Sequence, residues 1–139
     1  MTLEILEVNG NRPLPIELSE ITRPFWEGLE QGVFQTTKCL ECKKIMFPPK
    51  AICPKCLSRE LEWQSIRGDG VLYSYTTIHA APPMFSAQKP LRVAIVDLEE
   101  GLRLVCRLLG TDEPVLNSPV RLVVSKYDDG SMFAARSNA

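Results

Sequence analysis

Four of the five cysteines form two C-x-x-C pairs, Cys39 with Cys42 and Cys53 with Cys56, and ten residues separate the pairs. A C-x-x-C turn directs two sulfur atoms toward one point, so two such turns provide the four ligands of a tetrahedral divalent ion. Because all four ligands are thiolates, no coordination position remains for water or a substrate. The spacing therefore predicts a structural metal site in a small ribbon, with the two turns joined by a ten-residue β-hairpin. We expect zinc rather than iron, although four sulfur ligands alone accept both metals.

The residues directly after the second cysteine of each pair are Lys43 and Leu57. Metal-binding turns of this kind usually carry glycine there, because a positive φ lets the backbone amides point at the sulfur atoms. A residue other than glycine in that conformation costs on the order of 1 kcal/mol. Metal binding exceeds this cost by a wide margin, so we still expect the site to form.

The cysteine segment is also the basic part of the chain. Residues 38–59 contain six lysine and arginine residues and one acid, whereas the whole chain has a net charge of -1. Four thiolates around a divalent ion add about two negative charges, so a small positive patch remains. Lys43, Lys44 and Lys50 are therefore candidates for binding phosphate groups, and solvated surface charge is the equally simple interpretation.

Residue types that act in catalysis are sparse. His79 is the one histidine, and no nearby motif supplies the partner and the orienting group that a general base needs. Cys106 shares one side of its expected strand with leucines, which favours a buried, inert thiol over a nucleophile. The sequence contains no G-x-S-x-G, no phosphate-cradling glycine loop and no H-E-x-x-H. We therefore expect no catalytic residue in this chain.

The elements that must position these residues are mainly β. A short helix is expected in residues 22–32, with Thr22 as its cap, Pro24 in its first turn and Gly32 at its end. Five later runs are rich in β-branched and aromatic residues and are bounded by turn sequences, which predicts strands at 71–80, 91–98, 102–110, 119–127 and 131–136. Five strands at hairpin spacing predict a closed barrel of the OB-fold type.

Three parts follow from this pattern. We expect an N-terminal segment with the helix in residues 1–36, a zinc ribbon in 37–66 and the OB-fold in 67–139, with no regular element before Thr22. On the helix, Phe25 and Trp26 belong to an apolar face. We expect these two side chains to pack in the core, and a helix that faces a partner is the alternative.

Composition limits the class of protein. A chain of 139 residues with 45% hydrophobic content buries a real core, and one compact unit with a small appendage is expected. No stretch approaches the ~18 apolar residues of a membrane span, and the amino terminus lacks a signal-peptide pattern. An odd cysteine count, with four cysteines at metal spacing, favours reduced thiolates over disulfides, so a cytoplasmic location is expected.

The order of the motifs resembles a family that combines an N-terminal helix, a rubredoxin-like zinc ribbon and an OB-fold. The matching pieces run in the order PFWEGLEQG, C-x-x-C, FPPK, CPKC, LEW, GDGVLYSYT, the strand that ends near His79, and KP followed by AIVDLEEGLRL. The resemblance extends from about Pro15 to Phe133. Members of this family were long known only as a domain of unknown function and are described as acyl-CoA-associated. Lys43, Leu57 and the turn NSPV at 117–120 depart from the glycines that are usual at these places.

This resemblance implies a non-catalytic accessory subunit of a thiolase-fold enzyme, or of a hydratase or aldolase, that helps to enclose a CoA ester. Lys43, Lys44 and Lys50 would then meet the phosphate groups of CoA. A groove between the helix and the barrel, beside Phe25 and Trp26, would hold the less polar part of the ligand. His79 completes the set of candidate ligand-binding residues.

Single-stranded nucleic-acid binding is the alternative function, because zinc ribbons and OB-folds also serve this purpose. Such binding requires a basic track and several exposed aromatic residues. Tyr73 and Tyr75 are expected to share one face of their strand, which favours this alternative. The net charge of -1 opposes it, because phosphate contacts dominate such affinity. An enzyme acting on its own is the third and weakest interpretation.

Overall fold

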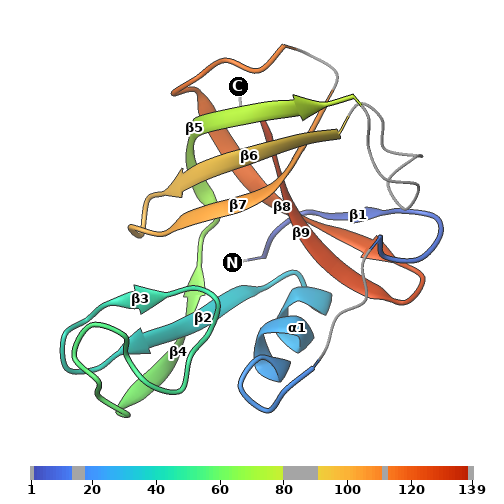
Figure 1. The fold of residues 1–139 in the computed structure, drawn as a ribbon. Coiled ribbons are helices and arrows are strands. Elements are labelled where there is room, and N and C mark those ends of the chain that lie inside the picture. Colours follow the sequence, from blue (N-terminus) through green and yellow to red (C-terminus); the bar gives the residue numbers. More distant parts are fainter. Residues whose placement is uncertain (1, 14–17, 80–90, 111–112, 138–139) are drawn as a thin grey trace.

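The computed structural model describes residues 2–13, 18–79, 91–110 and 113–137. Within these ranges the elements are β1 (Ile5–Glu7), α1 (Arg23–Glu30), β2 (Phe34–Cys39), β3 (Ile45–Met46), β4 (Leu61–Ile66), β5 (Asp69–Ile78), β6 (Leu91–Leu98), β7 (Arg103–Leu109), β8 (Pro119–Tyr127) and β9 (Gly130–Ser137). Strands β5 to β9 form a barrel, and α1 lies beside the smaller sheet of β2, β3 and β4 (Figure 1). No helix in the described part of the chain is long and apolar enough to cross a bilayer.

The barrel closes in the order β5-β6-β7-β9-β8, and β8 pairs again with β5. Strands β7 and β9 are parallel, whereas the other neighbouring pairs are antiparallel. Alternate apolar side chains fill the interior, among them Leu104 and Leu108 of β7 and Val120, Leu122 and Val124 of β8. This closure leaves few free strand edges, and it confirms the predicted five-stranded OB-fold. Strands β6 and β8 have the predicted bounds.

Strand β5 contains a β-bulge at Tyr73 that the alternation of the sequence did not reveal. Leu72 pairs with Val96, but the next paired residue is Ser74, opposite Ile95. The extra residue changes the face on which later side chains lie. Tyr75 is therefore opposite the buried Ala94 and packs against the core, whereas Tyr73 is half-exposed. The expectation that Tyr73 and Tyr75 share one face was wrong, and the two rings do not form a stacking track.

The sequence predicts an irregular segment before the helix, but this segment contains strand β1. Ile5 to Glu7 pair in parallel with Val124 to Lys126 of β8, where β5 no longer covers that edge. Leu3 precedes the strand and is buried, with its N–H donating to the carbonyl of Gly32 at 2.6 Å. The N-terminal segment thus joins the barrel edge to the end of the helix.

Helix α1 is shorter than predicted, and its cap differs. Thr22 precedes the helix, but its side chain makes no capping hydrogen bond and instead lies 3.0 Å from the hydroxyl of Ser19. Pro24 lies in the first turn and Gly32, with φ of 79°, follows the last turn, both as predicted. Phe25 and Leu29 form the buried face.

An aromatic cluster joins the helix, the ribbon and the barrel. Phe25 of α1 lies 5.2 Å from Phe34 of β2 and 6.1 Å from Phe133 of β9, measured between ring centroids. Phe47, which follows β3, lies 5.3 to 5.6 Å from each of these three rings. Most of these pairs are edge-to-face, and such pairs contribute about 0.5–1.5 kcal/mol each beyond their buried area. The cluster therefore fixes the ribbon against the barrel.

The ribbon is a three-stranded sheet in the order β3-β2-β4. Strand β2 pairs with β3 through Thr37 and Met46, and with β4 along its full length. The predicted boundary between the N-terminal segment and the zinc ribbon, at 36/37, falls inside β2. The predicted boundary between the ribbon and the OB-fold, at 66/67, falls at the end of β4. The separation into three independent parts stays a prediction.

Candidate metal centre

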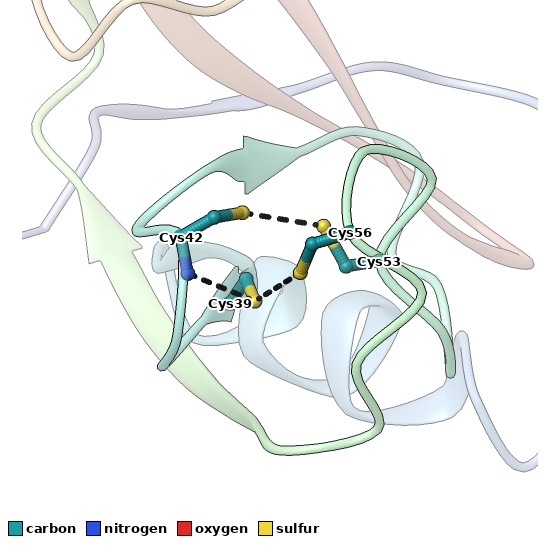
Figure 2. A group of neighbouring side chains, drawn as sticks. All are labelled: Cys39, Cys42, Cys53 and Cys56. Carbon is teal, nitrogen blue, oxygen red and sulfur yellow. Dashed lines mark hydrogen bonds between the residues drawn. The ribbon is translucent and has the colours of Figure 1, made fainter.

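The four sulfur atoms of Cys39, Cys42, Cys53 and Cys56 all lie within 4.8 Å of one another. They point toward a common centre from the two C-x-x-C turns, the first of which begins at the end of β2 (Figure 2). The shortest separations are 3.5 Å, between Cys39 and Cys56 and between Cys42 and Cys53. A disulfide needs about 2.05 Å between sulfur atoms. Four ligands at 2.3 Å from a tetrahedral ion would be about 3.8 Å apart, so the arrangement fits a metal ion.

The two knuckles that carry these cysteines have the same backbone geometry. Lys43 and Leu57 adopt φ of 66° and 64°, the left-handed conformation expected from their positions. The N–H of Lys43 donates to the carbonyl of Cys39, and the N–H of Leu57 donates to the carbonyl of Cys53. These turns direct further backbone N–H groups at sulfur, as in the 3.5 Å contact from Cys42 to the Cys39 sulfur.

The connection between the knuckles differs from the predicted ten-residue hairpin. Residues 43–52 contain a single two-residue strand, β3, which returns along β2 rather than pairing within the segment. The hairpin is therefore formed by β2 and β3, with the first knuckle as its turn. The second knuckle lies between β3 and β4. Strand β2 is the central strand of the ribbon: it pairs with β3 on one edge and with β4 on the other, and it ends at Cys39.

Backbone N–H groups lower the pKa of two of the cysteine thiols, Cys39 and Cys53. The backbone N–H of Cys42 is the main cause that lowers the pKa of Cys39 to about 6. Burial acts to raise the pKa of Cys53, but the backbone N–H groups of Cys56 and Lys55 reverse this effect and leave the pKa lowered.

Cys56 behaves in the opposite way. The backbone N–H of Ser58 acts to lower the pKa of Cys56, but burial and the neighbouring sulfur atoms of Cys39, Cys42 and Cys53 raise it to about 12. The neighbouring sulfur atoms thus oppose the ionisation of Cys56, and a divalent cation at their centre would remove this opposition.

Two of the three predicted ligand-binding lysines line one cavity. Lys44 and Lys50 line a cavity of about 260 Å³ between the ribbon and the turn that joins β6 to β7. Lys43 is exposed and does not line this cavity. Arg103 of β7 does line it, although sequence reasoning did not identify this residue. A cationic residue 53 positions from Lys50 is brought near only by tertiary packing, so no local signal could have found it.

The other candidates occupy three different environments. Phe25 is 2% exposed and is surrounded by aromatic rings, so it packs in the core in this structure. Trp26 is partly buried beside it, with ring centroids 4.8 Å apart. His79 is exposed just after the end of β5. Between the helix and the barrel, the ring of Phe25 packs against those of Phe34, Phe47 and Phe133, and the ligand groove beside Phe25 and Trp26 stays a prediction.

Cys106 lies in the barrel core and outside the metal centre. The side chain is buried, and burial raises the pKa of its thiol to about 12. A thiol of this kind stays protonated at neutral pH and is a poor nucleophile.

Two domain families match adjoining segments that together make up most of the chain. Residues 26–62 match “ChsH2, rubredoxin-like zinc ribbon domain”, and residues 63–125 match “ChsH2, C-terminal OB-fold domain”. Among solved structures, “Ltp2-ChsH2(DUF35) aldolase” covers 90% of this chain and 100% of its own chain, with a TM-score of 0.79 and 29% identity.

Two curated relatives share parts of this sequence. A “DUF35 domain-containing scaffold protein” of Methanocaldococcus jannaschii is 39% identical over 74 residues, which are 52% of each chain. A “Probable enoyl-CoA hydratase alpha subunit” of Thermomonospora curvata is 37% identical over 101 residues, which are 70% of this chain and 31% of the relative. The chain therefore spans about half of the first relative and about a third of the second.

Proposed function

Because the chain belongs to the ChsH2 (DUF35) family, we propose that it is a non-catalytic subunit that binds an enzyme of CoA-ester metabolism. The observation that carries this proposal is the metal centre, where four thiols leave no position for a substrate. The names of the relatives support a partner of the aldolase or hydratase type, since they include an aldolase and a hydratase subunit, and the scaffold protein among them supports a non-catalytic role. A thiolase-fold partner is what the sequence resemblance implies.

The metal in this proposal is zinc, held by Cys39, Cys42, Cys53 and Cys56 as thiolates. Bound there, the ion supplies a cross-link between the two knuckles rather than Lewis-acid chemistry. Because β2 ends at Cys39 and carries Phe34 at its other end, the cross-linked ribbon is continuous with the aromatic cluster. The metal would thus stiffen a platform that includes the helix and one side of the barrel.

Turnover would belong to the partner enzyme. Cys106 is buried and keeps its proton, and Tyr75 donates its hydroxyl hydrogen to Glu113 at 2.9 Å. The hydrogen bond to Glu113 raises the pKa of Tyr75, so this hydroxyl, like the Cys106 thiol, keeps its proton at neutral pH. The proposal therefore assigns this chain to assembly and to enclosure of the substrate.

Direct contact with an acyl-CoA is the finer part of the proposal. Lys44 and Lys50 line one cavity, and Lys43, Trp26 and His79 are each at least partly accessible. We keep these five side chains as candidate ligand contacts. Phe25, which the sequence also indicated, would act by supporting Trp26 from the core.

Purification from native cells tests this proposal. An affinity-tagged copy should retain an untagged enzyme of the thiolase, aldolase or hydratase class, and acyl-CoA turnover should require that enzyme. A variant with Cys53→Ser is the matched control, because it should lose both the metal and the partner. Acyl-CoA turnover by the purified chain alone would overturn the non-catalytic assignment, and consistent recovery of nucleic acid instead of an enzyme would overturn the partner class.

A further inference from the structure

We propose that Cys56 is an oxidation site, and that its oxidation by hydrogen peroxide joins it to Cys39 through a disulfide between the two knuckles. This inference goes beyond the proposed function, because it concerns the metal centre itself and needs no partner enzyme. The four cysteines would hold a metal ion under reducing conditions and release it reversibly under oxidising conditions.

The two knuckles differ in their exposure to solvent. Residues 54–57 of the second knuckle are all exposed, and Cys56 is among them. By contrast, Cys39 and Cys53 are 0% exposed, and Cys42 is intermediate. The oxidation of a cysteine depends on its thiolate character and on its accessibility. Because all four metal ligands are thiolates, accessibility decides which sulfur atom a peroxide reaches first, and this is the sulfur of Cys56.

The sulfur of Cys39 is placed to complete the disulfide. It lies 3.5 Å from the sulfur of Cys56, and the two residues belong to different knuckles. A disulfide needs about 2.05 Å between sulfur atoms, so this pair has to close by about 1.5 Å. Cys39 ends strand β2 and donates its N–H to the carbonyl of Lys44 at 2.8 Å, whereas Cys56 lies in the exposed knuckle. Most of the movement should therefore come from Cys56.

The oxidation proceeds in two steps. The Cys56 thiolate attacks one oxygen of hydrogen peroxide, the O–O bond breaks, and a sulfenic acid forms on Cys56 while the hydroxide that leaves takes a proton from solvent. The Cys39 thiolate then attacks the Cys56 sulfur, the S–O bond breaks, and the S–S bond forms while a second hydroxide takes a proton from solvent. The two thiolates thus lose two electrons, which reduce one molecule of hydrogen peroxide to two of water.

The disulfide removes two of the four metal ligands at once. A sulfur atom in a disulfide no longer carries the negative charge of a thiolate, and the thiolates of Cys42 and Cys53 alone are too few to hold a structural ion. The bridge still connects the two knuckles, which a disulfide within either C-x-x-C turn would not do. Cys42 and Cys53 also lie 3.5 Å apart across the knuckles, so further oxidation would add a second bridge of the same kind.

Titration of the zinc-loaded chain with hydrogen peroxide tests this proposal. A chromophoric chelator measures the zinc released, and peptide mapping by mass spectrometry locates the disulfides after alkylation of the remaining thiols. The first cross-linked product should join Cys39 to Cys56, in proportion to the zinc released. Dithiothreitol and added zinc should restore the starting protein. Cys106 is buried in the barrel core and should stay a free thiol, so it is the internal control.

The sequence allows each possible bridge to be assigned. Cleavage after Lys55 by trypsin separates Cys53 from Cys56, and cleavage after Glu41 by a glutamyl endopeptidase separates Cys39 from Cys42. The four cysteines therefore fall on four different peptides.

Histidine variants test the order of the two steps, because structural zinc sites accept three cysteines and one histidine. Cys56→His removes the accessible sulfur and should slow zinc release by on the order of tenfold. Cys39→His is the matched control, because it keeps Cys56 but removes its partner. Dimedone, which traps sulfenic acids, should label Cys56 more strongly in this control than in the unchanged chain. Where a variant does not hold zinc, the peptide map of the unchanged chain decides alone.

Three results overturn the proposal. The first is an initial disulfide other than Cys39–Cys56, such as a bridge within one C-x-x-C turn. The second is zinc release from Cys56→His as fast as from the unchanged chain, and the third is zinc release with irreversible oxidation and no disulfide. None of these results affects the proposed function, which is tested separately by retention of a partner enzyme.

Discussion

Lys43 and Leu57 occupy equivalent positions in the two cysteine knuckles and share a left-handed backbone, with φ of 66° and 64°. Each donates its N–H to the carbonyl of the first cysteine of its own knuckle, at 3.0 and 2.8 Å. Two residues with unrelated side chains therefore adopt the same unfavourable backbone conformation. The common cause is the requirement that two sulfur atoms converge on one point.

Replacing Leu57 by glycine should stabilise the protein. Relief of the left-handed strain contributes about 1–2 kcal/mol, and the greater freedom of glycine in the unfolded chain removes about 0.5–1 kcal/mol of that gain. The side chain is 75% exposed, so little packing is lost. Urea denaturation of the zinc-loaded protein measures the net change. Leu57→Ala keeps the strain and should not stabilise, and equal stability of the glycine and alanine variants would contradict this account.

Loss of one sulfur ligand should unfold the ribbon. Structural zinc contributes on the order of 10 kcal/mol to small metal-dependent domains, so Cys53→Ser or a strong chelator should disorder β2, β3 and β4. Elemental analysis should find about one zinc per unchanged chain and much less in the variant. Cys106→Ala lies outside the centre and should retain its metal. A ribbon with native amide protection and no metal would refute the structural role.

The parts of this fold that sequence reasoning could predict depend on local patterns. The bounds of β6 and β8 follow from β-branched runs between turn residues, and the four-sulfur cluster follows from cysteine spacing. Strand β1 could not be predicted, because three residues gain their order from β8, more than a hundred positions away. The bulge at Tyr73 and the place of Arg103 in the same cavity lining as Lys50 likewise depend on pairing and packing between distant segments.

The aromatic cluster should be the main mechanical link between ribbon and barrel. Phe34 is 1% exposed and contacts the rings of Phe25, Phe47 and Phe133, so Phe34→Ala should cost about 3–5 kcal/mol. Chemical denaturation monitored by both circular dichroism and metal release measures this cost. Tyr73→Ala removes a half-exposed ring and should cost far less. Similar costs for the two variants would show that the cluster is not the link.

Leu3 should anchor strand β1 to the barrel. Its side chain is 5% exposed and lies against Gly68 and the end of the helix, so Leu3→Ala should cost about 2–4 kcal/mol. The N–H of Val124 donates to the carbonyl of Glu4 at 2.8 Å, and its hydrogen exchange should accelerate in the variant. Ile5→Ala on the same strand removes a side chain that is 39% exposed and should have a smaller effect. Unchanged exchange at Val124 in the Leu3 variant would contradict the anchor.

The buried thiol of Cys106 should make the protein less stable at alkaline pH. Burial raises its pKa from 9.0 to about 12 in the folded protein, whereas the unfolded chain ionises near the ordinary value. The unfolded state therefore loses its proton first, and the contribution to stability is fully present below pH 9 and falls as the pH rises toward 12.

Cys106→Ala should remove this dependence, so the stability difference between the two proteins should shift by about 1 kcal/mol between pH 8 and pH 10 in favour of the variant. Denaturation at fixed zinc concentration measures the shift, because the metal ligands are common to both proteins and cancel in the difference. A constant difference across this range would mean that Cys106 ionises in the folded protein as readily as in the unfolded chain.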